Sequence, residues 1–279
     1  DTDHAANLFG LREFGNIYTR LMNPTTNVLE ERVAALEGGV AAVATSSGHA
    51  AQFTVFHMLM EPGDEILASN KLYGGSITQM GHSFQKFGWK TNFVDPTPEN
   101  FKSALNDNVK GIFVESLANP GGIVTDIAGI AAVAKEADIV MIVDNTLVTP
   151  YLCRPIEHGA DIVVHSLTKF LGGHGNSIGG IVVDSGKFDW MKNDKYPTFS
   201  KPCDSYHGLV IGETFGPDMG NIAFAIACRV LSLRDIGQCL SPQNAFYILN
   251  GIETLPLRMQ KHCDNALEVA TYLKSHDKV

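Results

Sequence analysis

Residues 139–169 read IVMIVDNTLVTPYLCRPIEHGADIVVHSLTK, and this stretch contains the pattern that the rest of the chain repeats. Two short apolar runs, Ile139–Val143 and Ile162–His165, each end on polar side chains. Short runs rich in Val and Ile and bounded by polar residues are typical of strands buried on both faces of a sheet. Ligands of such sheets bind beyond the carboxyl ends of the strands, so we expect the chemistry just after each run.

The same alternation extends to both sides of this stretch. Further apolar runs are Glu65–Ala68, Thr91–Val94, Gly111–Glu115 and Gly180–Val183. Helical stretches between the runs are Ala50–Met60, Gly74–Phe87 and Asp126–Ala137. Strands that alternate with helices require crossover connections, so the chain is predicted to be an α/β protein with a mainly parallel sheet flanked by helices.

The two ends of the chain differ from this central region. Residues 1–23 show no clear periodicity and are predicted to be an irregular arm. The segment TTNVLEERVAALEGG then predicts a helix, with a capping box at Asn27 and Glu30 and a stop at Gly38-Gly39. We expect residues 24–235 to form one large domain. Residues 236–279 are expected to be a long or broken helix that leads into a truncated C-terminal domain.

One segment inside the large domain is polar and contains Pro and Gly. Residues 185–217 include KPCDSYHGLVIGETFGP and are predicted to be a long surface excursion. A helix is expected after it, over Asn221–Leu233.

Composition excludes several classes of protein. The 279 residues are 44% hydrophobic and 18% charged, as in an ordinary globular protein. The formal charge of −9 and the lack of a Lys/Arg cluster argue against a nucleic-acid partner. No apolar run approaches the roughly 18 residues of a membrane span, and the first residues do not resemble a signal peptide.

The cysteines and histidines predict neither a disulfide framework nor a metal site. Five cysteines lie far apart without a CxxC pair, and the ten histidines show no HExxH spacing. This usage favours reduced thiols in a cytoplasmic protein.

Two strand ends carry the strongest chemical signals. Asp144 in VDNT could bind a metal, act as a base, hold a ribose or pair with a protonated ring nitrogen, and a solvated loop carboxylate is equally compatible. Ser166, Thr168 and Lys169 follow the next run and suit an anion or a carbonyl compound. Apolar neighbours would desolvate the Lys169 amine and leave it nucleophilic, although most lysines simply point to water.

Two upstream segments add weaker signals. In SSGHAAQ, residues 46–52, Gly48 at a helix start would let backbone N–H groups approach a phosphate. The segment is neither a Walker loop nor a GxGxxG fingerprint, which leaves a dinucleotide-dependent dehydrogenase remote. Tyr73 in KLYGGS could stack on a flat cofactor, or could be half-buried packing.

Taken together, these four parts match what pyridoxal 5′-phosphate requires. That cofactor needs a Schiff-base lysine, a carboxylate for its ring nitrogen, an anion site and a stacking ring. Lys169, Asp144, Gly48 and Tyr73 would supply them.

The motifs YTRLMNPT, SSGHAA, LYGG, ESLANP, VDNT and SLTKFLGGHGNSIGG resemble those of the Cys/Met-metabolism family of pyridoxal-phosphate enzymes. The resemblance implies the aspartate-aminotransferase-like fold (type I), with Lys169 bonded to the cofactor and also catalytic, Asp144 on the ring nitrogen and Tyr73 stacked and assisting proton transfer. It further implies a phosphate site formed by Ser46, Gly48, His49, Ser166 and Thr168. Asn119 would lie near the cofactor hydroxyl, and Tyr18 and Arg20 would reach from the arm to a neighbouring subunit.

Within the family, residues 204–217 and 240–259 resemble the O-acetylhomoserine sulfhydrylase branch. That branch implies γ-replacement on O-acetylhomoserine with sulfide or a small thiol, which gives homocysteine for methionine biosynthesis, in a homotetramer built from dimers. Gly75 stands where methionine γ-lyases typically carry a cysteine, and His49 departs from the usual Gln or Met. Cystathionine γ-synthase, methionine γ-lyase and a non-catalytic cofactor-binding chain stay open as alternatives.

Length is the main departure from the family. Its members normally continue into a C-terminal domain that carries an arginine for the substrate carboxylate, so we expect that domain to be missing or truncated here. Arg258 lies inside a predicted helix and is interpreted as structural.

Overall fold

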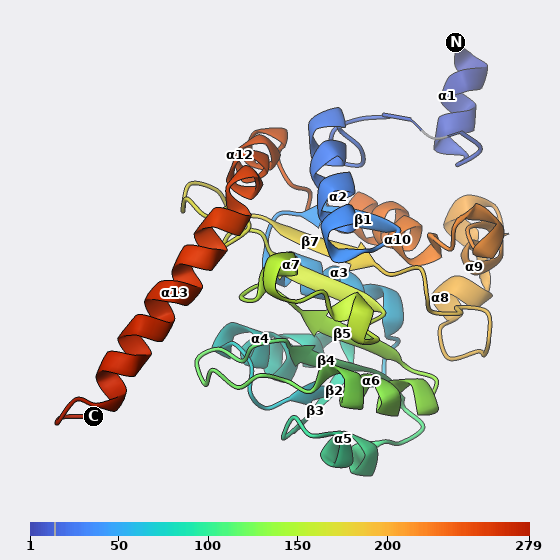
Figure 1. Ribbon diagram of the computed structural model, residues 1–279. Helices are drawn as coiled ribbons and strands as arrows, with labels where there is room; N and C mark the ends of the chain where they lie inside the picture. The colour runs from blue at the N-terminus through green and yellow to red at the C-terminus, as the bar shows by residue number, and fades with distance from the viewer. Residues whose placement is uncertain (14) are drawn as a thin grey trace.

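A seven-stranded sheet forms the centre of the computed structural model, which describes residues 1–13 and 15–279 (Figure 1). The strand order is β1-β7-β6-β5-β4-β2-β3. Strand β7 runs antiparallel to both of its neighbours, β1 and β6, and the other adjacent strands are parallel. The predicted α/β class with a mainly parallel sheet is therefore confirmed. The strands are β1 Ala41–Thr45, β2 Glu65–Ser69, β3 Lys90–Val94, β4 Val109–Glu115, β5 Val140–Asp144, β6 Ile162–Ser166 and β7 Gly180–Asp184.

Helices connect and cover these strands. Their bounds are α1 Thr2–Phe9, α2 Pro24–Glu37, α3 Gly48–Leu59, α4 Gly74–Thr78, α5 Pro98–Ala104, α6 Ile127–Glu136, α7 Thr149–Leu152, α8 Pro197–Ser200, α9 Ile211–Thr214, α10 Ala223–Ala227, α11 Arg234–Ile236, α12 Pro242–Glu253 and α13 Leu255–Lys274. After α4 the helical path continues to Phe87 with wider and then tighter turns, so the predicted helix over 74–87 changes its winding along its length. A short hairpin of β8 Pro202–Cys203 and β9 Leu209–Val210 lies apart from the main sheet.

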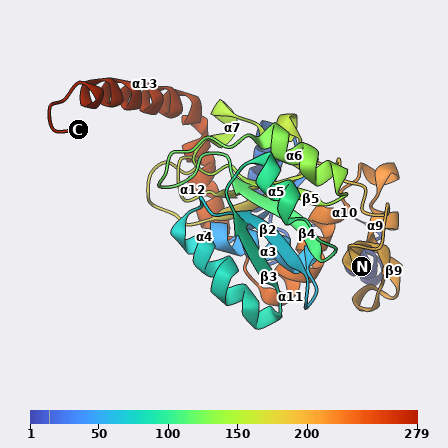
Figure 2. The ribbon, with the colours of Figure 1, turned by 90° about the horizontal axis from the view of Figure 1, so that it is seen from below.

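The sheet separates two apolar cores. Alternation along β1 shows this directly, because Val43 packs into one core while Ala42 and Ala44 pack into the other. Helices α3 and α10 bury their apolar residues in the first core, and α2, α6 and α12 bury theirs in the second. In Figure 2, α6 lies on one side of the central strands and the helix that begins with α4 lies on the other.

Strand β1 and the start of α2 differ from the sequence-based expectation. The segment AAVAT lacks the β-branched density of the other strands and was not expected to be one; it forms β1 because it pairs antiparallel with β7. The cap of α2 is Asn23, whose side chain accepts a hydrogen bond from the Thr25 N–H, and not Asn27. Proline at the first helical position already favours this earlier start.

The prediction of a surface excursion over residues 185–217 is wrong. Trp190, Tyr196, Phe199 and Phe215 are buried there, and the Trp190 ring stacks on Phe224 of α10 at 5.2 Å between centroids. Most residues of this segment are polar, but its few large aromatic side chains pack into the first core. The apolar area that each of these rings buries stabilises the segment against the core despite its polar composition.

The two ends of the chain bury few side chains. Residues 2–9 form the helix α1 with no buried residue, so the arm is not irregular throughout, and position 14 of the predicted arm lies outside the described residues. At the other end, α13 has only Leu255 and Met259 buried, and both views show it running away from the sheet (Figures 1 and 2). In the part of the chain that the structure describes, none of the helices combines the length and the hydropathy that a membrane span needs.

Candidate active site

A cavity of about 510 Å³ lies at the carboxyl ends of β4, β5 and β6, beside the first turn of α3. Its volume is in the usual range for small-molecule sites, and its place is the one that parallel sheets favour. Eight of the eleven predicted site residues line it: Gly48, His49, Tyr73, Asn119, Asp144, Ser166, Thr168 and Lys169. The structure thus brings together five chain segments that are up to 121 residues apart (from Gly48 to Lys169, 169 − 48).

The first turn of α3 forms one wall of the cavity. Ser47 caps this helix by accepting a hydrogen bond from the Ala50 N–H at 3.1 Å. Gly48 packs so closely on Ser166 that a Cβ added to it would lie 2.7 Å from the Ser166 Cβ. Free N–H groups at a helix start favour an anion. The glycine therefore lets a strand end and a helix start face one anion together.

The predicted role of Ser46 is not supported by its position. Ser46 is exposed and does not line the cavity, and its N–H donates to the Gln238 carbonyl oxygen at 2.8 Å. Ser47 lines the cavity in its place. The sequence SSG does not say which serine is the cap, because either hydroxyl could reach a backbone N–H.

Asp144, the last residue of β5, is held by three hydrogen-bond donors. Its Oδ1 accepts from the Thr146 N–H at 2.9 Å and from the Thr146 hydroxyl at 2.5 Å. Its Oδ2 accepts from the Gln52 amide at 3.2 Å, and that amide also donates to the Ser76 hydroxyl. These bonds fix one orientation of the carboxylate against the cavity, as a partner for a cationic ring nitrogen requires.

Lys169 lines the cavity but is exposed, so the expected packing of its amine among apolar neighbours is wrong for this chain. Leu167 and Leu171 are buried in the second core, whereas Lys169, which lies between them in the sequence, is exposed. A position open to the cavity leaves its amine accessible to a carbonyl compound. Nearby, the Thr168 hydroxyl donates to the Gly179 carbonyl oxygen at 3.2 Å, which ties this turn to the strand that follows.

The rings of Tyr73 and His49 stack at 5.9 Å between centroids, with 29° between their planes. Tyr73 is 51% exposed, so His49 supports one side of a ring that is otherwise open to the cavity. Gly75 makes this arrangement possible, because a Cβ there would lie 2.4 Å from Tyr73 Cε1 and 2.8 Å from His49 Cε1. Burial lowers the pKa of His49, partly offset by the charge of Asp144, which favours a neutral imidazole.

Glu115, at the end of β4, was not recognised from the sequence. It is buried, it lines the cavity, and it accepts backbone hydrogen bonds from Tyr73 at 2.7 Å and from Asn119 at 3.1 Å. Burial is the largest cause that raises the pKa of Glu115 to about 7, and the neighbouring Asp144 raises it further. The signal was present in the sequence, since Glu115 ends an apolar run as Asp144 does.

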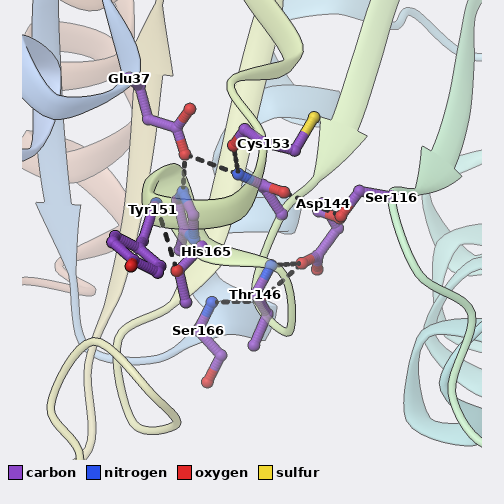
Figure 3. A network of polar contacts seen from close by, with 10 residues as sticks. Glu37, Ser116, Asp144, Thr146, Tyr151, Cys153, His165 and Ser166 are labelled. Carbon is purple, nitrogen blue, oxygen red and sulfur yellow. Dashed lines mark hydrogen bonds and ion pairs between the residues drawn. The ribbon is translucent and has the colours of Figure 1, made fainter. Parts of the chain in front are cut away.

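A buried polar network braces the strand ends from behind the cavity (Figure 3). Glu37, the last residue of α2, contacts the His165 ring at 2.6 Å and accepts from the Asn145 amide at 2.9 Å. The Ser116 hydroxyl donates to the Asn145 side-chain oxygen at 2.8 Å. His165 and Asn145 are the neighbours in sequence of Ser166 and Asp144, so the network fixes the backbone that carries both cavity residues.

Three arginine and tyrosine positions lie away from the cavity in this chain. The Arg20 guanidinium lies over the Tyr18 ring at 5.0 Å, and neither residue lines the cavity. Arg258 donates from Nη1 to the Phe170 carbonyl oxygen and from Nη2 to that of Gly251, both at 2.7 Å, which agrees with a structural role. No group of three or more metal-ligating side chains occurs within residues 1–13 and 15–279.

Comparison with known proteins agrees with this geometry. The sequence model described as "Cys/Met metabolism PLP-dependent enzyme" matches residues 1–279. The chain is 56% identical to an O-acetyl-L-homoserine sulfhydrylase of Leptospira meyeri, over all of this chain and 64% of that protein. It thus spans less than two thirds of the length of that relative.

Two solved structures are similar to the fold. A Campylobacter jejuni protein assigned as an O-acetylhomoserine (thiol)-lyase, which carries a pyridoxyl-lysine phosphate, matches with a TM-score of 0.95 and 41% identity, over 99% of this chain and 68% of that one. Cystathionine γ-lyase from Lactobacillus plantarum, complexed with L-serine, matches with a TM-score of 0.78 and 34% identity, over 95% of this chain and 60% of that one.

Proposed function

The chain belongs to the Cys/Met metabolism family of pyridoxal-phosphate-dependent enzymes, and we propose that it acts in γ-replacement on O-acetylhomoserine. The observation that supports this most directly is the convergence of Lys169, Asp144 and the first turn of α3 on one cavity. The aspartate-aminotransferase-like fold that the sequence motifs implied agrees with the match to a pyridoxyl-lysine-containing structure.

The residues of the cavity fit pyridoxal phosphate. The close approach of Gly48 to Ser166 leaves the helix start open to a phosphate, and His49 and Thr168 line the same wall. The oriented Asp144 carboxylate would pair with a protonated ring nitrogen. The exposed Tyr73 ring would stack on the cofactor ring, and Asn119 would lie near the ring hydroxyl. Lys169 would hold the cofactor covalently. When bound, the cofactor supplies an electron sink for carbanion chemistry next to the substrate amino group.

The overall reaction is a displacement at the γ carbon. The bond between that carbon and the acetate oxygen breaks, and a bond to the sulfur of sulfide or a small thiol forms, which yields homocysteine or its thioether. The Lys169 amine, when it is free, would serve as the base that removes the α proton of the substrate. Asp144 would keep the ring nitrogen of the bound cofactor protonated, and the Tyr73 hydroxyl would assist proton transfer near the leaving group.

The choice of branch rests on the Gly75 region and on the comparisons. The (thiol)-lyase structure matches with a TM-score of 0.95, against 0.78 for the cystathionine γ-lyase. The rings of His49 and Tyr73 occupy the space that a side chain at position 75 would need. The first observation favours a sulfhydrylase over a cystathionine γ-lyase, and the second argues against a methionine γ-lyase, whose members typically carry a cysteine at this position.

The assembly and location follow the same proposal. We propose a cytoplasmic homotetramer built from dimers, in which the arm of residues 1–23 carries Tyr18 and Arg20 to the cofactor phosphate of a neighbouring subunit. The helix α1 has no buried residue in the single chain, which is compatible with such a contact. Residues 24–235 would be the cofactor-binding domain, and 236–279 the helix that leads into a further domain.

The experiment that tests the function compares acceptors and donors in the steady state. Full-length protein loaded with pyridoxal phosphate is given O-acetyl-, O-succinyl- and O-phosphohomoserine, each with sulfide or with cysteine. We expect the acetyl ester with sulfide to give the highest kcat/KM. A preference for cysteine would indicate a cystathionine γ-synthase. Release of 2-ketobutyrate from methionine alone would indicate a methionine γ-lyase, and cofactor absorbance without any turnover would indicate a non-catalytic chain.

Gly75→Ala tests the space between the two rings. The added Cβ would fall within 2.4 Å of the Tyr73 ring and must displace it. We expect kcat/KM to fall on the order of 10²-fold, as a misplacement of about 1 Å can cause. Gly74→Ala is the matched control, because no atom lies within 4 Å of a Cβ there, and it should keep wild-type kinetics. Equal kinetics for both variants would refute the packing role of Gly75.

A further inference from the structure

Glu115 and Asp144 form a pair of carboxylates at the cavity. The register of the parallel strands β4 and β5 places the two residues directly opposite each other. Their hydrogen bonds differ in kind. Asp144 accepts from the Thr146 hydroxyl and the Gln52 amide besides one backbone N–H. Among the described residues, the Glu115 carboxylate accepts only from the backbone N–H groups of Tyr73 and Asn119.

The Glu115 carboxylate connects the two loops across the cavity wall. Its Oε1 accepts from the Tyr73 N–H at 2.7 Å, and its Oε2 accepts from the Asn119 N–H at 3.1 Å. Glu115 is only 6% exposed, whereas Tyr73 and Asn119 are both exposed. Two exposed side chains that face one ligand are thus held through their backbones by a single buried group. Hydrogen bonds to an ionised acceptor are stronger than those to a neutral one.

We propose that Glu115 is a positioning residue, whose ionised carboxylate holds Tyr73 and Asn119 in the arrangement that grips the cofactor ring. This inference rests on the proposed function, because it takes the cavity to be the cofactor site. Nothing in the proposed chemistry requires Glu115 to exchange a proton with substrate. Its contribution is the placement of the two loops.

The charges around Glu115 make this placement depend on pH. The titratable or charged groups that line the cavity with it are Asp144 from β5, Lys169 after β6, His49 from α3 and Tyr73 before α4. Because burial and Asp144 raise the pKa of Glu115 to about 7, its charge changes near neutral pH. Below that pH the protonated carboxyl becomes a donor on one oxygen, and one of the two backbone bonds is weakened.

The effect of Glu115 on global stability has the opposite sign. The folded state raises its pKa from the ordinary value of 4.5, so it binds the proton more tightly than the unfolded chain does. The stabilising contribution of this group is therefore complete below about 4.5 and is lost as the pH rises through about 7. A merely structural role predicts that lower pH tightens the region, whereas the positioning role predicts that lower pH loosens the two loops.

Amide hydrogen exchange in the cofactor-free, full-length protein separates these roles. We expect peptides containing the Tyr73 and Asn119 amides to exchange about tenfold faster in Glu115→Gln than in wild type at pH 8, after correction for intrinsic rates. In wild type the same peptides should exchange faster, after that correction, at pH 6 than at pH 8. This wild-type comparison keeps the test valid even if the variant does not fold. Equal protection at both pH values, or higher protection at pH 6, would overturn the proposal.

Cofactor affinity gives the second readout. We expect the Kd for pyridoxal phosphate to rise about tenfold in Glu115→Gln at pH 8, and the wild-type Kd to rise on going to pH 6 while that of the variant changes less. Asp161→Asn is the matched control: burial also raises the pKa of Asp161, to about 6, and it accepts from the Met141 N–H, but it lies before β6 and outside the cavity. It should leave both readouts at wild-type values.

The two proposals fail in different ways. If no homoserine ester is turned over with sulfide at any pH, the proposed function fails. The exchange of the Tyr73 and Asn119 amides still tests whether Glu115 positions these two residues. If turnover is found but the Glu115→Gln variant keeps wild-type exchange and Kd, only the positioning role is refuted.

Discussion

Lys169→Ala is expected to abolish covalent attachment of pyridoxal phosphate and to lower kcat by at least about 10²–10⁴-fold, because one side chain supplies both the covalent link and the base. The exposed position of Lys169 in the cavity means that its removal opens no core and should leave folding intact. The visible absorbance band of the loaded wild type and its loss in the variant, with mass spectrometry of the borohydride-reduced protein, measure the attachment directly.

Two further lysine variants control this result. Lys169→Arg keeps a positive charge in the cavity but cannot form a stable Schiff base, so we expect it to be as inactive as the alanine variant. Lys102→Ala removes an exposed lysine that pairs with Glu136 far from the cavity and should bind the cofactor normally. A Lys169→Ala protein that still yields a reduced cofactor adduct on another lysine at wild-type stoichiometry would contradict the assignment.

Asp144→Asn is expected to lower kcat by about 10²–10³-fold with a smaller change in cofactor affinity. The amide is nearly the same size and can still accept from Thr146, but it carries no charge to hold a proton on the ring nitrogen. Preorganised charge is among the largest contributions to catalysis in a site shielded from water. Steady-state kinetics together with the pH dependence of the cofactor absorbance separate the loss of charge from a loss of binding.

Asp95→Asn is the matched control for that variant. Asp95 also follows a strand, β3, and accepts from the Asn70 amide at 2.8 Å, but it is exposed and does not line the cavity. It should retain wild-type kinetics. If Asp144→Asn did the same, the carboxylate would not be the partner of the ring nitrogen.

Much of the site could be predicted because its residues follow short stretches of sequence whose local pattern indicates a strand or a helix start. The runs ending at Asp144 and Ser166 are short continuous apolar segments rich in Val and Ile, which is the pattern of parallel strands buried on both faces, and the carboxyl ends of such strands meet at one edge of the sheet. The start of α3 at Gly48 was also predictable, because a serine followed by a glycine is a local pattern typical of a helix N-terminus. These strand ends alone predict Lys169 and Asp144 as site residues.

Other features depended on partners distant in sequence. β1 forms because its backbone pairs with the antiparallel strand β7. Trp190 and Phe199 are buried because Phe224 of α10 packs against their rings. The exposure of Lys169 was also mispredicted, since only the direction of its turn relative to the core decides it.

The sequence by itself determined the class of fold, the edge of the sheet where the cavity lies, and the lysine and aspartate that line it, because hydrophobic periodicity and strand ends are local properties. Only the tertiary structure decided that Glu115 holds Tyr73 and Asn119, that Glu37 and His165 pair beneath the strand ends, and that Ser47 rather than Ser46 faces the cavity. A hydrogen bond between side chains far apart in the chain has no periodic signal, since it depends on where separate elements come to rest.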